Sequence, residues 1–167
     1  DIWRRTTERD ALLGVSMTGI ASKENLQLDY KEASKLVNET NKEIAKLIGI
    51  NPAARTTSVK PAGTTSLVLG TSSGIHAWYS EFYKRRMRIG KEESIYTYLL
   101  ENHPNLIEDE YFRPTQQAVL TVPQRAPEGA ITRHESALDL LERVKFISTN
   151  WVRNGYRKGQ NHHNVSC

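Results

Sequence analysis

The sequence is poor in cysteine and has no long hydrophobic run, and each shortage excludes a class of protein. Cys167 is the one cysteine among 167 residues. An internal disulfide framework is therefore excluded, and a reducing compartment such as the cytoplasm is indicated. No apolar run approaches the roughly 18 residues of a membrane-spanning helix, and no signal peptide opens the sequence. We predict a cytoplasmic protein without a membrane partner.

The excess of positive charge is also small. The chain has 23 basic and 19 acidic residues, a net charge of +4, and aromatic residues make up 8% of it. This balance favours an anionic ligand but does not indicate a nucleic acid. Hydrophobic residues at 38% and charged residues at 25% are typical of a soluble globular protein. They exclude wholesale disorder.

The two ends of the sequence suggest a piece of a longer protein. The chain starts at Asp1, without methionine, and ends inside NHHNVSC, an alternating segment that is typical of a strand. Its length suits one domain or part of a larger one. Because we find no internal repeat, low-complexity tract or linker, we expect residues 1–167 to form a single structural unit.

Two helices are expected in the first third of the chain. Residues 29–49 repeat apolar side chains every three or four positions. Asp29 and Glu32 form a capping pair at the start of this helix, and Gly49 closes it. Residues 11–21 (ALLGVSMTGIA) are apolar and rich in small side chains, which we interpret as a buried, closely packed helix.

Two more helices are expected later in the chain. Residues 92–102 form the first, with Pro104 beyond its end. The second begins at a capping box of Thr132 and Glu135 and ends at Asn154-Gly155. Its core-facing stripe consists of Ala137, Leu140, Leu141, Val144, Ile147 and Trp151.

Strands are expected at residues 55–61, 83–89 and 117–123 and in the final NVSC. Residues 83–89 alternate Tyr, Arg, Met and Ile with Lys and Arg, so this strand has a basic face. Because strands alternate with helices along the chain, we predict an α/β protein whose strands are mainly parallel.

The segment SVKPAGTTSLVLGTSSG, residues 58–74, has the pattern of an anion site. A strand ends at Lys-Pro, and Ala-Gly then leads into a helical turn. Unpaired N–H groups and the positive end of the helix dipole meet there, and the hydroxyls of Thr64, Thr65 and Ser66 can donate as well. Gly63 allows a ligand to approach the backbone closely. The pattern favours phosphate, while a plain strand-to-helix turn capped by threonine stays open. A P-loop is excluded, because its Gly-Lys-Ser/Thr ending is missing.

Other chemically suggestive residues carry weaker signals. The basic strand FYKRRMR could contact nucleic acid, but such faces are more often solvated or paired with acidic neighbours. His76 is interpreted as a structural hydrogen-bonding group. His162 and His163 are adjacent on a predicted strand and point to opposite faces, so we expect no metal shared with Cys167. We assign no metal ligand and no catalytic residue within the chain.

Several motifs, taken in order, resemble the catalytic subunit of ribonucleotide reductases, and most closely the adenosylcobalamin-dependent class. VKPAGTTS is similar to a KPSGT-type loop. GTSSGIHAWYSEFYKRRMRIGK resembles the SGIH, tyrosine and arginine-rich strand that follow this loop in the family. Three further segments agree in the same order: GVSMTGI, TVPQRAPEGAITRHESALDLLERV and WVRNGYRKGQNHHNVSC. The resemblance covers nearly the whole chain.

The resemblance implies a fold and a site. The fold would be the family's ten-stranded α/β barrel, with this chain as its C-terminal part. Ala62 stands where the family often has serine, which removes one possible hydroxyl donor and leaves the backbone N–H groups. The substrate's phosphates would be held by Pro61, Ala62, Gly63, Thr64, Thr65 and Ser66.

The resemblance also implies an activity, namely reduction of ribonucleotides to 2′-deoxyribonucleotides for DNA synthesis by thiyl-radical chemistry. Triphosphates are the expected substrates, and adenosylcobalamin would be the radical source. The radical cysteine with its asparagine and glutamate neighbours, the reducing cysteine pair and the allosteric deoxynucleotide site would lie upstream. A thioredoxin-type protein would supply the electrons. Cys167 lies where the family does not require cysteine, so we assign it no redox role.

Three alternatives remain at this point. The first is the large subunit of a metal-dependent class I reductase, which shares the barrel. The second is a non-catalytic module that binds nucleotide phosphates, and the third is a basic nucleic-acid-binding domain.

Overall fold

The computed structural model describes residues 1–166 and divides the chain into two compact units. The larger unit comprises Asp1–Trp78 and Pro127–Cys167, and the hairpin unit comprises Tyr79–Ala126. The sequence led us to expect one unit. Cys167, and with it the end of the predicted NVSC strand, lies outside the described residues. No helix among residues 1–166 is both long and apolar enough to cross a membrane.

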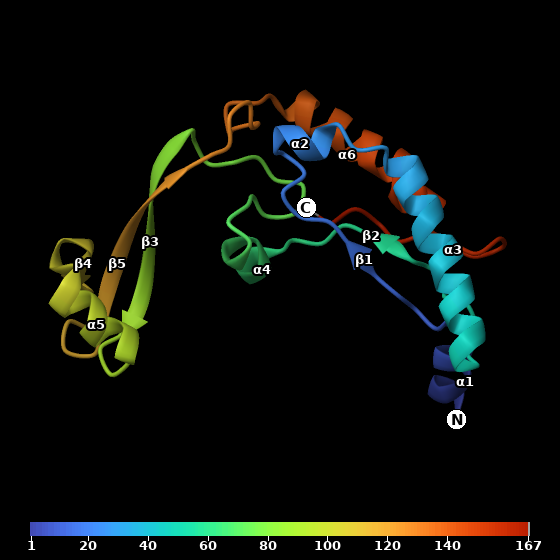
Figure 1. Ribbon diagram of the computed structural model, residues 1–167, viewed down its shortest axis with the longest axis horizontal. Helices are drawn as coiled ribbons and strands as arrows, with labels where there is room; N and C mark the ends of the chain where they lie inside the picture. Colours follow the sequence, from blue (N-terminus) through green and yellow to red (C-terminus); the bar gives the residue numbers. More distant parts are fainter. Residues whose placement is uncertain (167) are drawn as a thin grey trace. The chain divides into compact units, whose positions relative to one another are not determined.

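The larger unit places helices beside a short parallel sheet. Strands β1 and β2 pair in parallel, and an isolated parallel bridge joins Val59 to Val165. The predicted α/β class and the parallel pairing are therefore confirmed here. Figure 1 shows α3 and α6 side by side, next to this sheet. The elements are α1 (Ile2–Asp10), β1 (Val15–Ser16), α2 (Lys23–Leu26), α3 (Tyr30–Ile48), β2 (Thr57–Ser58), α4 (Gly63–Val68), α6 (Ala137–Asn150) and the 3₁₀ helix η2 (Val152–Asn154).

Helix α3 has both of the ends that its sequence predicts. The Asp29 carboxylate accepts a hydrogen bond from the N–H of Glu32 at 3.0 Å. Gly49 adopts the left-handed conformation, with φ at 76°, and its N–H donates to the carbonyl of Ala45. Glycine is suited to this position because it has no Cβ to clash there.

The predicted helix over residues 11–21 is wrong. Its centre forms β1, which pairs with β2 some forty residues later, and the rest is extended chain and turn. Gly19, with φ at +69°, begins the turn, and the hydroxyl of Thr18 donates to the carbonyl of Ser72. The small side chains allow close packing, as expected, but against a strand and a turn.

Helix α6 begins later than predicted. Its capping box consists of Ser136 and Asp139, whose side chain and backbone groups bond each other reciprocally. Hydrogen bonds from the side chain and backbone of Ser136 lower the pKa of Asp139. The predicted box failed because the carboxylate of Glu135 pairs with Arg143 instead of capping the helix.

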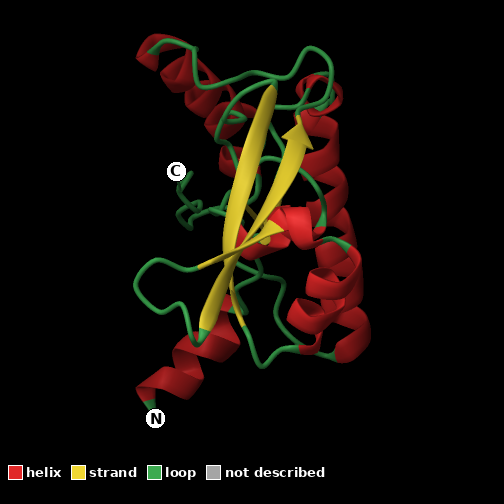
Figure 2. Ribbon diagram, turned by 90° about the vertical axis from the view of Figure 1, so that its left-hand side faces the viewer, coloured by secondary structure: helices red, strands yellow, loops and turns green. Residues whose placement is uncertain are grey.

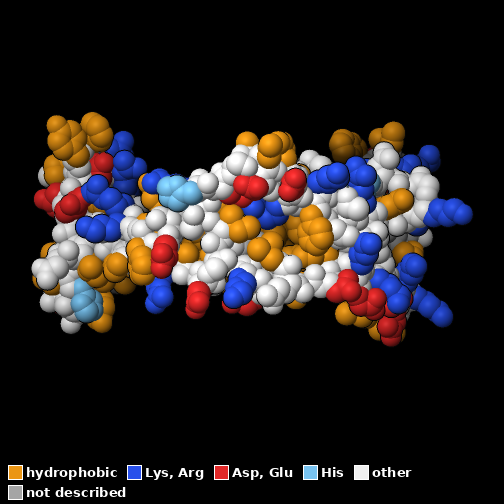
Figure 3. All heavy atoms as spheres, turned by 90° about the horizontal axis from the view of Figure 1, so that it is seen from above, with side chains coloured by type: hydrophobic (Ala, Val, Ile, Leu, Met, Phe, Trp, Pro, Cys, Tyr) orange, Lys and Arg blue, Asp and Glu red, His pale blue; other side chains and the backbone are white. Residues whose placement is uncertain are grey.

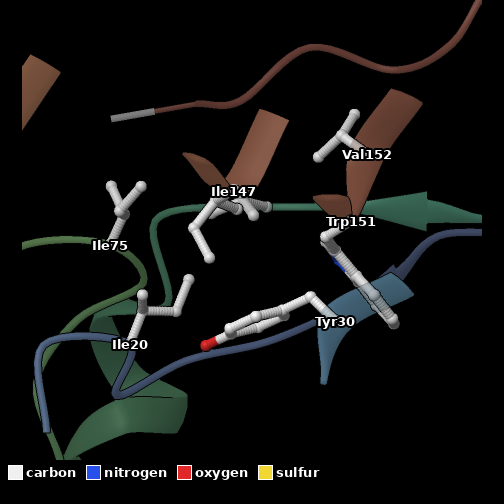
Figure 4. Packing of buried hydrophobic residues seen from close by; sticks show 7 residues of the cluster. Ile20, Tyr30, Ile75, Ile147, Trp151 and Val152 are labelled. Carbon is white, nitrogen blue, oxygen red and sulfur yellow. The ribbon is translucent and has the colours of Figure 1, made fainter. Parts of the chain in front are cut away.

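The core of the larger unit joins segments that are far apart in the sequence. Figure 4 shows the side chains of Ile20 and Ile75 near Ile147, with Tyr30 beside Trp151. Each of these residues is at most 2% exposed. The core therefore fixes the chain just after β1 and β2 against α3 and α6. Its members are Ile20, Tyr30, Val59, Ile75, Ile147, Trp151 and Val152.

The hairpin unit is an antiparallel sheet with one helix. Figure 2 shows its two long strands running side by side. Strands are present at both predicted places, residues 83–89 and 117–123, but they pair in antiparallel fashion, so the prediction of mainly parallel strands is wrong in this unit. The strand order is β3-β5-β4. The elements are β3 (Phe82–Gly90), α5 (Ser94–Asn102), the 3₁₀ helix η1 (Pro104–Leu106), β4 (Ile107–Asp109) and β5 (Gln117–Arg125).

Acidic residues of β4 and the turn after it lie opposite the basic face of β3. Arg86 pairs with Glu108, and Arg88 pairs with Glu110 at 3.2 Å. Figure 3 shows acidic and basic side chains interleaved at its left-hand end, over this unit. Much of the positive charge on β3 therefore has a partner within the unit.

Glu110 is buried and anchors the turn after β4. Its Oε2 accepts hydrogen bonds from the N–H groups of Phe112 and Arg113, both at 2.8 Å. Its Oε1 accepts from Nε of Arg88 at 3.2 Å. Burial by itself would raise the pKa of Glu110, but the N–H groups of Arg113 and Phe112 and the Arg88 guanidinium together hold it below its usual value.

We expect this turn to loosen in acid. Because the pKa of Glu110 is lower in the folded protein, its stabilising contribution is complete above the unfolded value of about 4.3 and is lost as pH falls through the folded value. Amide hydrogen exchange at Phe112 and Arg113, corrected for the intrinsic rate, should accelerate in that window. In Glu110→Gln both amides should exchange faster at neutral pH and respond less to acid. Equal protection of these amides in the wild-type protein and in Glu110→Gln would show that Glu110 does not anchor the turn.

Candidate phosphate-binding site

The candidate site is the 61–66 loop, which comprises the end of the connection after β2 and the first turn of α4. The loop leaves the carboxyl end of β2, beside the carboxyl end of the parallel strand β1. Ligand sites of open α/β sheets lie at this edge, because the connections that leave the strands converge there. The predicted strand and helical turn are thus both present, and the six predicted residues lie at that edge.

The first turn of α4 leaves three backbone donors free. Its first helical hydrogen bond runs from the N–H of Ser66 to the carbonyl of Ala62 at 2.8 Å. The N–H groups of Gly63, Thr64 and Thr65 come before this bond, so the helix offers them no acceptor. No side chain caps this end, and no acceptor for the three groups is found among residues 1–166. The three donors are available to an anion.

The hydroxyls of the loop fall into two groups. Thr64 and Thr65 are exposed, as are Pro61 and Gly63. Ser66 is buried, and its hydroxyl donates to the carbonyl of Gly63 at 2.9 Å. The predicted hydroxyl donors are therefore available at the two threonines, while the hydroxyl of Ser66 holds the turn together.

Gly63 has no structural requirement for glycine. Its φ lies outside the left-handed region, and a Cβ placed on it would meet no atom within 4 Å. A Cβ at this position would therefore fit the fold without a clash.

A turn at residues 72–75 packs against the entrance of the loop. Gly74 has φ at +54°, and a Cβ on it would lie 2.6 Å from the carbonyl oxygen of Lys60. Its N–H donates to the hydroxyl of Thr18 at 2.9 Å. Sequence reasoning did not single out Gly74 or Thr18, although GVSMTGI and SGIH were both recognised as motifs. The structure brings these two motifs together behind the loop.

The three histidines considered in the sequence, none of which was expected to bind a metal, contact backbone carbonyls. His76 is exposed, and its N–H donates to the carbonyl of Ser73. Nε2 of His163 lies 3.0 Å from the carbonyl oxygen of Leu13, and Nδ1 of His162 is bonded to the carbonyl of His163. Residues 1–166 contain no group of three His, Cys, Asp or Glu side chains that could hold a metal ion.

A solved structure shares this fold. The crystal structure of a B12-dependent (class II) ribonucleotide reductase matches all of this chain with a TM-score of 0.75 and 20% identity, over 27% of its own chain. The chain therefore has an α/β fold found within a class II ribonucleotide reductase.

Proteins similar in sequence to this chain are named as adenosylcobalamin-dependent reductases. A probable adenosylcobalamin-dependent ribonucleoside-triphosphate reductase of Dictyostelium discoideum is 28% identical over 87% of this chain and 20% of its own. The adenosylcobalamin-dependent ribonucleoside-triphosphate reductase of Euglena gracilis is 26% identical over 91% of this chain and 22% of its own. No family model matches.

The chain is thus similar over most of its length to adenosylcobalamin-dependent ribonucleoside-triphosphate reductases, as its motifs predicted. It spans about a fifth of the length of these curated relatives. The relatives' names fit the adenosylcobalamin class and not the class I alternative.

Proposed function

We propose that this chain supplies the substrate-phosphate loop of an adenosylcobalamin-dependent ribonucleoside-triphosphate reductase. The enzyme reduces ribonucleotides to 2′-deoxyribonucleotides, and residues 1–167 form part of its ten-stranded catalytic barrel. The observation that carries the proposal is the set of three free N–H groups at the carboxyl edge of the parallel strands, on a chain whose relatives are such reductases.

In this proposal the loop binds and orients the substrate. The N–H groups of Gly63, Thr64 and Thr65 and the two threonine hydroxyls donate to phosphate oxygens, and hydrogen bonds to charged oxygens are stronger than neutral ones. Fixing the phosphates fixes the ribose at the edge of the sheet, where the reacting groups of the enzyme must meet it. Such positioning lowers the entropic part of the barrier.

The proposal also includes a cofactor and further catalytic groups, to which we assign no residue of this chain. Adenosylcobalamin would supply the radical, and we assign none of residues 1–166 to it. The thiyl cysteine, the reducing cysteine pair, the allosteric deoxynucleotide site and the surface for a thioredoxin-type reductant are placed outside these residues. The enzyme would work in the cytoplasm.

The test uses the full-length reductase with Thr64→Val, Thr65→Val or Gly63→Val. The threonine changes keep the β-branched shape and remove one hydroxyl donor each. A hydrogen bond to a charged group contributes about 1.5–3 kcal/mol, so each should raise the Kd for the ribonucleotide roughly ten- to a hundredfold. The Gly63 change should weaken binding by blocking the free N–H groups. Binding is measured by titration and reduction by formation of the deoxynucleotide.

Two controls separate the possible failures. Thr40→Val, an exposed threonine of α3, should leave substrate affinity unchanged. Cleavage of adenosylcobalamin driven by the allosteric effector alone should survive in all loop variants, because the cofactor is placed elsewhere. Unchanged affinity in all three loop variants would leave the loop as an ordinary helix start. Phosphate binding by a full-length protein that reduces no ribonucleotide would favour the non-catalytic module.

A further inference from the structure

We propose that Arg143 is a positioning residue for the 61–66 loop, which it holds in place through the carbonyl of Ile75. The inference rests on the proposed function, because it concerns how the substrate-phosphate loop is kept in its binding geometry. It assigns a role to the buried ion pair of Arg143 and Glu135, which lies outside the 61–66 loop.

Arg143 uses all three of its nitrogens inside the protein. It is 7% exposed on the buried side of α6. Nη1 and Nη2 donate to the two carboxylate oxygens of Glu135 at 2.5 and 2.8 Å. Nε donates to the carbonyl oxygen of Ile75 at 3.2 Å. The two-pronged contact with Glu135 fixes the plane of the guanidinium, and Nε is thereby aimed at one backbone carbonyl.

The carbonyl that Arg143 holds belongs to the turn behind the loop. The Ile75 side chain is fully buried in the core (Figure 4), so this residue is fixed on both sides. The preceding residue, Gly74, touches the backbone of Lys60 and Pro61 without room for a Cβ. Backbone contacts of this kind cannot be absorbed by a change of rotamer. A shift of the 72–75 turn therefore reaches the first residue of the 61–66 loop.

A second link joins Thr71, the residue just before this turn, to α4. The N–H of Thr71 donates to the carbonyl of Ser66 at 2.9 Å. The loop is thus attached to the segment 71–75 at both its beginning and its end, and Arg143 is the charged side chain that fastens this segment to α6.

The energetics favour a positioning role. Taking both charges of a buried pair out of water offsets much of their attraction, so such pairs are weak stabilisers overall. Their geometry is nevertheless strict. We infer that the pair of Glu135 and Arg143 contributes more to the place of the Ile75 carbonyl than to the stability of the unit.

The experiment measures Arg143→Lys in the full-length reductase. A lysine ammonium can pair with Glu135 but cannot also reach the Ile75 carbonyl in the same geometry, so the turn is loosened while the charge is kept. We expect KM for the ribonucleoside triphosphate to rise about tenfold, the equivalent of losing one ordinary hydrogen bond, with kcat within about twofold. Binding of the corresponding nucleoside without phosphates should be unchanged. Glu135→Gln, which removes the charge that orients the guanidinium, should raise KM in the same direction.

Arg157→Lys is the matched control. Arg157 also donates to backbone carbonyls, those of Pro52 and Arg9, and neither belongs to the 61–66 loop or to the 72–75 turn. Its replacement should lower the melting temperature without changing KM. If Arg143→Lys lowers the melting temperature and leaves KM unchanged, the pair is merely structural and the inference is overturned. If Thr64→Val and Thr65→Val change KM and Arg143→Lys does not, the inference fails while the proposed function stands. If none of the three variants Arg143→Lys, Thr64→Val and Thr65→Val changes KM, both the inference and the proposed function fail.

Discussion

Replacing Trp151 by alanine is expected to lower the free energy of unfolding by about 3–5 kcal/mol, the usual cost of removing a large aromatic side chain from a core. Trp151 is 2% exposed and ends α6 inside the core (Figure 4). Its indole Nε1 donates to the carbonyl of Ser58 at 3.0 Å. The substitution therefore leaves a cavity and, in addition, deprives a buried carbonyl of its partner.

Leu141→Ala is the matched control for this prediction. The sequence pattern placed Leu141 on the same core-facing stripe of α6, but the structure leaves it 61% exposed. Surface substitutions usually change stability by less than about 0.5 kcal/mol. Chemical denaturation followed by far-UV circular dichroism measures both variants. A loss below about 1 kcal/mol for Trp151→Ala would place the indole outside the core.

Local signals predicted those parts of the fold that local chemistry determines. Helix α3 was predicted because its periodicity and both of its caps, Asp29 and Gly49, are present in its own sequence. The strand end and helical turn of the 61–66 loop were predicted for the same reason. The free N–H groups follow directly from the way any helix begins.

Features that depend on distant partners were not predicted. Residues 11–21 have an apolar run that fits a buried helix or a buried strand, and periodicity does not separate the two for short runs. Residues 15 and 16 form a strand because Val15 pairs with Thr57 of β2. Glu135 fits a capping box in the sequence, but its carboxylate accepts hydrogen bonds from Arg143, eight residues later. The link from Arg143 to Ile75 spans 68 residues and has no sequence signature.

The antiparallel hairpin unit was missed for a topological reason. Strand β3, helix α5 and strand β5 follow one another as in a parallel crossover. After α5, however, the chain runs through η1 and β4 before β5 returns alongside β3 in the opposite direction. Alternation of strand and helix types does not reveal this return, which depends on the pairing of β4 with β5.

Gly74→Ala is expected to cost about 2–5 kcal/mol of unfolding free energy, and Gly70→Ala only about 1–2 kcal/mol. Both glycines adopt left-handed conformations, with φ at +54° and +64°, so both substitutions carry the same backbone penalty. A Cβ at Gly70 meets nothing within 4 Å, while a Cβ at Gly74 lies 2.6 Å from the carbonyl oxygen of Lys60. The difference between the two variants therefore isolates the contact between the 72–75 turn and the entrance of the 61–66 loop.

The same pair of variants connects stability with binding. Because Lys60 cannot yield without moving the loop, Gly74→Ala should raise KM for the ribonucleotide as well as lower the midpoint of denaturation. Gly70 lies beyond the far end of α4, so Gly70→Ala should lower the midpoint alone. Equal losses of stability in the two variants would mean that the chain around Lys60 gives way freely. In that case the turn could not transmit the position of Arg143 to the three free N–H groups of the 61–66 loop.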